Sequence, residues 1–293
     1  MTQPPPGPAT PPFGNASEGR FVISRRYAAG AGGVRGLLIT VLGDYVRPAG
    51  RAAPTSAFID VLGRLGAEED ASRQALTRAA ADGWIVPERE GRYTWWRLTP
   101  AFQHFLDIGA QRIFGFTATQ PGWDGRWVVV LARVAETNRA GRHLLRTRLR
   151  WSGFGNPAPG VWVSTHTARA AAITPILEEA GVCEESQIFL AEHLGGGEPS
   201  ALVRQAWDLG EIEGQYDAFL TAFTDPSSDD PLVRFTSLVH AWRVLPLTDP
   251  GLPEELLPPD WIGARAAALF RRRRAEWEPP ALQEWERISR EAR

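Results

Sequence analysis

The sequence predicts an α+β multidomain protein with an N-terminal winged helix-turn-helix, a ferredoxin-like middle domain and a helical C-terminal domain. Two helical patterns and a hairpin pattern follow one another over residues 55–98, strand and helix patterns alternate over 123–195, and only helical patterns follow residue 200. We expect, in chain order, a disordered Pro-rich arm, a winged helix-turn-helix domain, a ferredoxin-like middle domain and a helical domain, over residues 1–20, 21–115, 123–195 and 200–293.

The composition is that of an ordinary globular protein, being 43% hydrophobic and 23% charged over 293 residues. No apolar run approaches the length of a membrane span, and the single cysteine cannot form an internal disulfide, so we expect a cytoplasmic location. Positive charge is unevenly placed: residues 21–115 hold 12 arginines and 9 acidic residues, whereas residues 116–293 hold 19 arginines and 24 acidic residues. This asymmetry favours contact between the N-terminal part and a polyanion.

Helix and turn signals predict the elements of the N-terminal domain. A first helix with apolar residues at helical spacing is expected over 34–46, and Pro48 is expected to end it. A short helix begins near Thr55, and a second helix spans about 68–82. Two strand patterns then flank the turn Glu90-Gly91-Arg92. This order is typical of a winged helix-turn-helix, which fits the major groove of DNA.

The second helix has two faces. The inward stripe is predicted to be Ala71, Ala75, Leu76 and Ala79. The opposite face suits base contacts, because Arg bonds guanine, Gln bonds adenine, and Thr contacts a thymine methyl or a phosphate. Its residues are Arg73, Gln74, Thr77 and Arg78, and the hairpin adds Arg89 and Arg92 for phosphate or minor-groove contact. An ordinary solvated face is the alternative, and Glu68, Glu69 and Asp70 at the helix start would repel phosphate.

A helix from Thr99-Pro100 and a linker over 115–122 precede the middle domain. The middle domain is predicted as strand 127–134, helix 138–151, loop 153–160, strand 161–163, helix 169–180 and strand 187–191. Five helices are predicted to follow, over 202–209, 212–223, 232–244, 261–274 and 282–288. We interpret the four consecutive arginines, 271–274, as a solvated helix end that the helix dipole favours.

Motifs spread over residues 34–275 resemble those of the PaaX family of repressors of phenylacetic acid degradation. They include Asp82-Gly83-Trp84 and Trp123-Asp124-Gly125-Arg126-Trp127, with others at 38–46, 73–78, 93–100, 149–155, 159–162, 206–209, 240–243, 249–253 and 256–258. The resemblance implies a cytoplasmic homodimer with a winged-helix domain, a ferredoxin-like middle domain and a helical C-terminal domain. It also implies repression that is relieved by an aryl-acyl-CoA, typically phenylacetyl-CoA. Ser72 stands where the family pattern leads us to expect a bulkier apolar residue.

An aryl-acyl-CoA needs an apolar slot for its ring and cationic groups for its phosphates. Candidate effector-binding residues are Trp123, Arg126, Arg150, Trp151, Trp162, His240, Trp242 and Arg243. Any one of them can instead be a core aromatic or a structural ion pair.

No catalytic residue or metal site is predicted. The histidines, at 104, 143, 166, 193 and 240, lack metal-ligand spacing, and a nuclease would need carboxylates clustered around a divalent ion, of which the first middle-domain strand offers only Glu136. A DNA-bound scaffold without an effector remains the alternative to an effector-controlled regulator.

Overall fold

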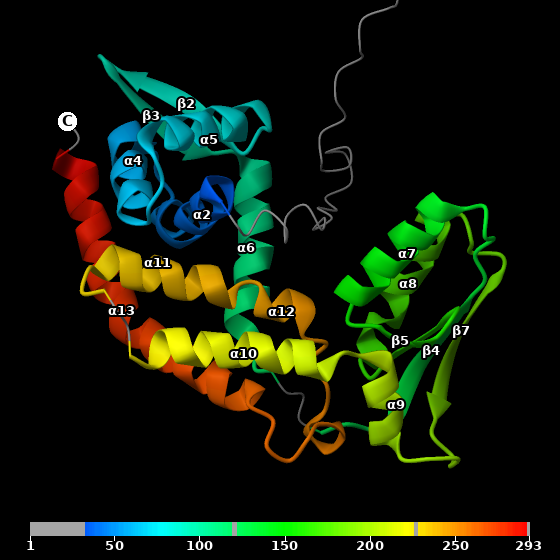
Figure 1. The fold of residues 1–293 in the computed structure, drawn as a ribbon. Coiled ribbons are helices and arrows are strands. Elements are labelled where there is room, and N and C mark those ends of the chain that lie inside the picture. Colours follow the sequence, from blue (N-terminus) through cyan, green and yellow to red (C-terminus); the bar gives the residue numbers. More distant parts are fainter. Residues whose placement is uncertain (1–32, 119–121, 226–227, 292–293) are drawn as a thin grey trace, which may run out of the picture. The chain divides into compact units, whose positions relative to one another are not determined.

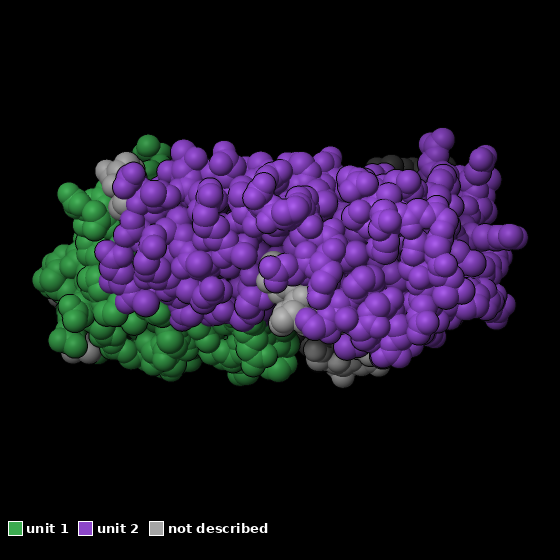
Figure 2. All heavy atoms as spheres, turned by 90° about the horizontal axis from the view of Figure 1, so that it is seen from below, with its two compact units in different colours: residues 1–111, 228–240, 277–293 green, residues 112–227, 241–276 purple. Residues whose placement is uncertain are grey.

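The structure is a computed structural model that describes residues 33–118, 122–225 and 228–291. The chain divides into two compact units, each built from more than one stretch of sequence (Figure 2). Unit 1 comprises residues 1–111, 228–240 and 277–293, and unit 2 comprises residues 112–227 and 241–276. The predicted arm, residues 1–20, lies outside the described residues. Two parts of the stretch that the sequence places in one C-terminal domain therefore belong to the same unit as the N-terminal helices.

The first helical segment of unit 1 is continuous from α2 (Val34–Val41) through the π-helical turn η1 (Leu42–Val46) to α3 (Arg47–Ala49). The Arg47 N–H bonds to the carbonyl of Leu42, five residues back, so the hydrogen-bond pattern is already shifted ahead of Pro48, which has no N–H to donate. The prediction that Pro48 ends this helix is therefore wrong. The helix ends at Gly50, whose φ of 62° is left-handed.

Two further helices and a hairpin follow in unit 1 (Figure 1). The helices are α4 (Thr55–Arg64) and α5 (Glu69–Ala81), and the hairpin strands are β2 (Ile85–Glu90) and β3 (Tyr93–Leu98). The short β1 (Ala53–Pro54) pairs with the other edge of β3, so an antiparallel sheet of order β1-β3-β2 closes this region. The long helix α6 (Pro100–Gly115) then leads from unit 1 into unit 2.

The buried face of α5 differs from the predicted stripe at one position. Ser72 is fully buried and Ala71 is only half-buried, whereas Ala75, Leu76 and Ala79 are buried as predicted. The Ser72 hydroxyl donates a hydrogen bond of 3.0 Å to the carbonyl of Glu68 within the same helix. This bond satisfies the hydroxyl, so a small polar residue can occupy the core position.

Helices from late in the sequence complete the core of unit 1. Tyr45 stacks on Trp285 with ring centroids 5.0 Å apart, and its hydroxyl lies 2.9 Å from that of Thr236. Trp285 also meets Phe58 of α4 edge-on at 5.6 Å. These contacts join η1 to α11 (Pro231–Trp242), and both η1 and α4 to the C-terminal part of α13 (Gly263–Glu291).

Unit 2 contains an antiparallel four-stranded sheet with the order β5-β6-β4-β7. Its strands are β4 (Arg126–Ala132), β5 (Gly155–Ala158), β6 (Val161–Ser164) and β7 (Ser186–Glu192). The helices α7 (Arg139–Trp151) and α8 (Ile173–Glu179) cover one face, and a 3₁₀ turn, η2 (Thr167–Ala172), replaces the start of the predicted 169–180 helix (Figure 1). The predicted loop 153–160 is wrong over β5, a strand too short and Gly/Pro-rich to show a strand pattern.

The opposite face of this sheet packs against α9 (Pro199–Ala206) and the 3₁₀ turn η3 (Glu254–Leu256). The contact is close at Gly155, where an added Cβ would lie 2.5 Å from the Trp207 ring and 2.7 Å from the Ala206 Cβ. Only glycine allows the edge strand and α9 to approach this closely.

The helical part of unit 2 surrounds the indole of Trp242. This ring is fully buried, stacks on Phe270 at 4.5 Å and donates a hydrogen bond of 3.1 Å to the carbonyl of Ile113. The rings that surround it include those of α10 (Leu209–Thr224) and of the first part of α13, and α12 (Leu245–Thr248) packs against α10. No helix in the described part of the chain is both long enough and apolar enough to cross a membrane.

Two predictions about the last helix are wrong. The sequence predicts separate helices over 261–274 and 282–288, but α13 is continuous and contains Pro279 and Pro280. The four-arginine run consequently lies inside a helix rather than at its end. Two of its members are held locally: Arg273 donates to the Phe223 carbonyl at 3.2 Å, and the Arg274 guanidinium lies 3.8 Å from the centre of the Phe114 ring.

Candidate nucleic-acid interface and cavities

The predicted contact face of α5 is exposed. The helix buries its apolar stripe against its own unit, and the four predicted residues share the exposed side: Arg73, Gln74, Thr77 and Arg78. They lie within two helical turns, the length that a helix presents to the edges of a few base pairs in the major groove.

Arg73 and Thr77 are engaged within the helix, whereas Gln74 and Arg78 have no side-chain partner among the described residues. The Arg73 guanidinium donates to Glu69 at 2.6 Å, and the Thr77 hydroxyl donates to the Arg73 carbonyl at 3.0 Å. Both members of the Arg73–Glu69 pair are more than half exposed. An exposed pair contributes at most about 1 kcal/mol, so a stronger partner can displace Glu69.

The hairpin presents its two predicted arginines to solvent. In Figure 1 the tip formed by β2 and β3 extends beyond α4 and α5. Arg89 and Arg92 are both exposed near this tip. Arg92 donates to the Tyr93 hydroxyl at 2.7 Å, while Arg89 has no partner among the described residues. Sequence reasoning missed Arg35, which pairs with Asp82 at 2.6 Å and lies 4.2 Å from the Trp84 ring centre, beside the end of α5.

The eight predicted effector-binding residues are divided between the two units. His240 belongs to unit 1, where its Nδ1 lies 3.0 Å from the Thr40 hydroxyl, and the other seven belong to unit 2. Trp162, Trp242 and Arg243 are buried, at 6%, 0% and 6% exposed. Burial of these side chains supports the structural alternative for each of them.

Three of the remaining residues have local roles. The Trp123 indole donates to the carbonyl of Arg126 at 3.0 Å, and the Arg126 side chain pairs with Asp124 at 2.6 Å, so both stabilise the turn before β4. The Trp151 carbonyl accepts a hydrogen bond of 3.2 Å from Arg112. Arg150 and Trp162 each line a cavity of unit 2.

Two cavities in unit 2 are lined by arginines, but only the smaller one has an excess of positive charge. The larger, of about 900 Å³, is lined by Arg150, Arg204 and Trp207, with Asp208 and Glu255 also at its wall. The smaller, of about 700 Å³, has Trp162 in its lining and no carboxylate; its cations are Arg133, Arg142 and Arg146, and the His143 ring lies among them. The sequence signal for the smaller cavity was the density of arginine on α7, which has no acidic residue.

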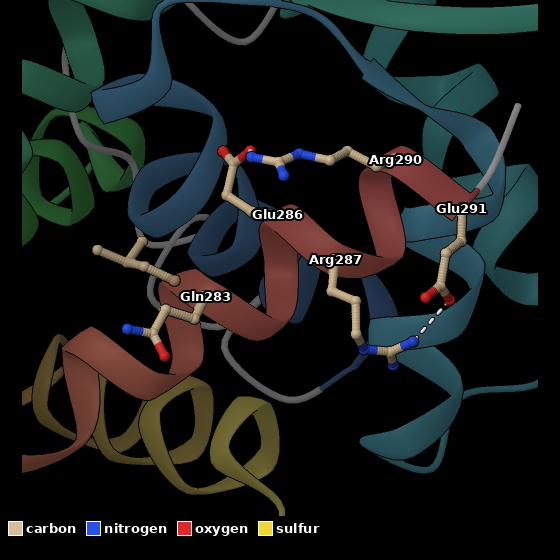
Figure 3. A pocket seen from close by; sticks show the side chains of 6 residues that line it. Gln283, Glu286, Arg287, Arg290 and Glu291 are labelled. Carbon is tan, nitrogen blue, oxygen red and sulfur yellow. Dashed lines mark hydrogen bonds and ion pairs between the residues drawn. The ribbon is translucent and has the colours of Figure 1, made fainter.

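A third cavity, in unit 1, is a shallow groove along the C-terminal part of α13 (Figure 3). Its two arginines are paired with acids on the same helix, Arg287 with Glu291 at 2.6 Å and Arg290 with Glu286 at 3.8 Å. The positive charge is neutralised locally, so this groove is a weaker anion site than the smaller cavity of unit 2, which has no carboxylate in its lining. The described residues contain no group of three or more His, Cys, Asp or Glu side chains placed to hold a metal ion.

Three family models match successive stretches of the chain. They are described as PaaX-like protein, PaaX protein central Cas2-like domain and PaaX-like protein C-terminal domain, and they match residues 34–101, 120–203 and 207–287. The transcriptional repressor PaaX of Escherichia coli strain K12 is 30% identical over 249 residues, which cover 80% of this chain and 77% of that protein. The chain belongs to the PaaX family.

The family stretches correspond to the structure in different ways. The first lies within unit 1, the Cas2-like stretch contains the whole four-stranded sheet of unit 2, and the third contributes helices to both units. A solved structure of the uncharacterised protein Rv0674 from Mycobacterium tuberculosis has a similar fold, with a TM-score of 0.64, 23% identity and coverage of 87% of this chain and 98% of that one.

Proposed function

We propose that this PaaX-family protein is a transcriptional repressor that binds operator DNA through a winged helix-turn-helix formed by α2, α4, α5 and the β2–β3 hairpin. The observation that carries the proposal is the exposed face of α5 beside the exposed arginines of the hairpin. In this arrangement α5 enters the major groove and the hairpin follows the backbone. The relative from Escherichia coli is named a transcriptional repressor, which supports the same conclusion.

Each residue of this face has a role in the proposal. Arg73 and Arg78 bind guanine, Gln74 binds adenine, and Thr77 contacts a thymine methyl or a phosphate. Arg73 must leave Glu69 to reach a base, which costs at most about 1 kcal/mol, while a bidentate guanine contact contributes about 1–3 kcal/mol. The exchange is therefore favourable on the matching sequence.

The experiment is operator binding by arginine variants, with the operator first identified by selection from random DNA. Arg73→Ala and Arg78→Ala should each weaken operator binding by about 1–3 kcal/mol and relax sequence preference at one position. Arg271→Ala is the matched control, because it removes one exposed arginine from unit 2. Unchanged affinity in the Arg73→Ala/Arg78→Ala double variant would reject α5 as the recognition helix.

We propose further that the repressor is a homodimer, formed through a ferredoxin-like middle domain. One winged domain contacts too few base pairs to discriminate an operator within a genome. Two copies related by a two-fold axis would recognise half-sites about 34–36 Å apart, or a multiple of that spacing.

The proposed effector is an aryl-acyl-CoA such as phenylacetyl-CoA, and its support is the family resemblance together with the two arginine-lined cavities of unit 2. Release of DNA requires tighter effector binding to the form that does not bind DNA, and a hundredfold preference supplies about 2.7 kcal/mol. Calorimetry with phenylacetyl-CoA, phenylacetate and CoA tests this effector class. No binding by any of the three would instead favour a DNA-bound scaffold without an effector.

Variants locate the phosphate-binding cavity. Arg204→Ala removes a cation from the larger cavity, and Arg146→Ala removes one from the smaller cavity. Loss of CoA affinity in one variant and not in the other assigns the phosphates to that cavity.

A further inference from the structure

The strand β7 forms one edge of the sheet in unit 2. All seven of its residues pair with β4, from Ser186 opposite Ala132 to Glu192 opposite Arg126. No strand in the described part of the chain pairs with its other side. The outward N–H and C=O groups of this edge are therefore a template for another strand.

The edge is also apolar on both faces of the sheet. Ile188 and Leu190 share the face of Val128 and Val130, which α7 and α8 cover, yet they remain 38% and 54% exposed. Phe189 lies on the opposite face and is 47% exposed. Three consecutive large apolar side chains in contact with water are unfavourable for a monomer.

The usual protection of an edge strand is missing. β7 contains no proline, no basic residue and no irregularity in its pairing with β4, and its one charge, Glu192, is at the end. Natural edge strands are commonly shielded by lysine, proline, bulges or short length. A regular seven-residue edge with an apolar centre and without these features indicates a strand that is covered in the functional assembly.

We propose that β7 is the dimer interface, where β7 of a second copy pairs antiparallel with it across a two-fold axis at Phe189. The proposal rests on the homodimer proposed above and deepens it. In this register Phe189 lies opposite Phe189 of the second copy. Ile188 of each copy lies opposite Leu190 of the other, and Gln187 lies opposite Ala191. The two sheets become one continuous eight-stranded sheet, and the apolar side chains of both copies shield one another.

The charges around β7 select this register. With the axis at Phe189, Glu185 lies opposite His193 and Ser186 lies opposite Glu192, so no two acids face each other. An axis at Ile188 would place Glu184 opposite Glu192, which is repulsive. An axis at Leu190 would place Ile188 opposite Glu192, which sets an apolar side chain against a charge. Moving the axis by one residue shifts the pairing of the two strands by two residues. A pairing shift of one residue is excluded, because it would set hydrogen-bonded positions opposite non-hydrogen-bonded ones.

Disulfide trapping tests the register in a background that lacks the native cysteine, Cys183→Ser. Directly opposite residues have Cβ atoms about 4.5–5.5 Å apart, close to the separation a disulfide needs. Phe189→Cys should therefore form a covalent dimer under mild oxidation. Gln187→Cys is the matched control: it is exposed on the same face but lies four residues out of register with its own copy. Mixed Gln187→Cys and Ala191→Cys proteins should cross-link to each other.

Light scattering tests the interface itself. Wild-type protein should be dimeric at micromolar concentration, and Ile188→Lys/Leu190→Lys should raise the dimer dissociation constant by about 100-fold or more, because two charges would be desolvated in each copy. Leu194→Lys is the control, because Leu194 is 94% exposed and follows the end of the strand. Circular dichroism checks that each variant is folded.

The outcomes are distinguishable from those for DNA binding. A monomeric wild type, a dimer unaffected by the double Lys variant, or equal cross-linking of Phe189→Cys and Gln187→Cys would each overturn the β7 interface. If the Lys variant fails to fold, the cross-linking comparison tests the interface instead, because the cysteine variants keep Ile188 and Leu190. Failure of the α5 assignment would appear instead as unchanged operator affinity in the Arg73→Ala/Arg78→Ala protein, whatever its oligomeric state.

Discussion

At the residue scale, the Asp249 side chain shows how a buried carboxylate fixes a loop of unit 2. Its Oδ2 accepts a hydrogen bond of 2.5 Å from the Tyr216 hydroxyl, and its Oδ1 accepts one of 2.6 Å from the Gly251 N–H. The next residue, Pro250, has its carbonyl 2.7 Å from Nε2 of His166. The motif 249–253, one of those that resemble the PaaX family, is thus tied to α10 and to the turn before η2.

Asp249 makes stability depend on pH. Burial raises the pKa of Asp249 from 3.8 to about 6, against the opposing effect of its hydrogen bonds. Between these values the folded protein holds a proton that the unfolded chain releases, so this contribution to stability is present below pH 4 and is lost as pH rises to 6. Burial, together with Arg169, lowers the pKa of His166, which destabilises the fold in acid and partly offsets this effect.

Asp249→Asn should remove the pH dependence that belongs to Asp249. The difference between variant and wild-type free energies of unfolding should shift in favour of the variant by at most about 3 kcal/mol from pH 4 to pH 7. Urea titrations across this range measure it, and His166 cancels because both proteins contain it. A difference independent of pH would show that the Asp249 pKa is not raised.

Gly155→Ala should destabilise unit 2. The new methyl would meet the Trp207 ring at 2.5 Å, so either β5 or α9 must move, at a cost of about 1–3 kcal/mol. Gly214→Ala is the matched control: it lies in α10 with nothing within 4 Å of the added carbon and should be neutral or stabilising by up to about 1 kcal/mol. Thermal unfolding compares the two, and equal melting temperatures would contradict the tight contact.

At the scale of elements, the hairpin and α5 should differ in how salt affects their contacts. Arg89→Ala and Arg92→Ala should weaken binding to all DNA sequences alike, and each should reduce the slope of log affinity against log salt by about 0.9. Arg89→Lys keeps the charge and should keep the slope. A loss of affinity confined to the operator would mean that the hairpin contacts bases rather than phosphates.

Element prediction from sequence succeeded where one segment carries its own signal. α5 and the hairpin have clear periodicity and turn residues, and both are found within a few residues of the predicted bounds. Local sequence signals predicted the wrong helix bounds where tertiary packing determines how far a helix extends. Pro279 and Pro280 mark a helix end in a sequence, yet α13 continues through them with flanking residues such as Trp277 and Trp285 buried. The residues predicted to contact bases share one helix face, whereas no such constraint held the proposed effector-binding residues together.

At the scale of the whole molecule, unit 1 is assembled from three stretches that are far apart in sequence. Arg64 of α4 bonds Asp230 at 2.9 Å and Glu284 at 2.8 Å, and Arg287 and Arg64 lower the pKa of Glu284 to about 2. Sequence periodicity predicts that a helix has an apolar face but not which distant element covers it. The sequence therefore indicated the helices of unit 1 but not this assembly.

Truncation after residue 276 should unfold the proposed DNA-binding domain. It removes Trp285, which is 3% exposed and contacts both Tyr45 and Phe58. Trp285→Ala in the full chain is the milder variant and should cost about 3–5 kcal/mol of unfolding free energy, with Arg290→Ala, at 79% side-chain exposure, as the neutral control. Urea unfolding followed by circular dichroism measures both, and a stable, operator-binding truncated protein would contradict the shared core.

The late completion of this core has a consequence for biosynthesis. The residues proposed to contact DNA are translated before the side chains that close their core, which lie in residues 228–240 and 277–293. A nascent chain, or a product cut short by a nonsense codon or a protease, would lack a stably packed α4 and α5. Only chains that include these late segments would therefore bind the proposed operator. Shorter products could neither repress transcription nor compete with the intact protein for its site.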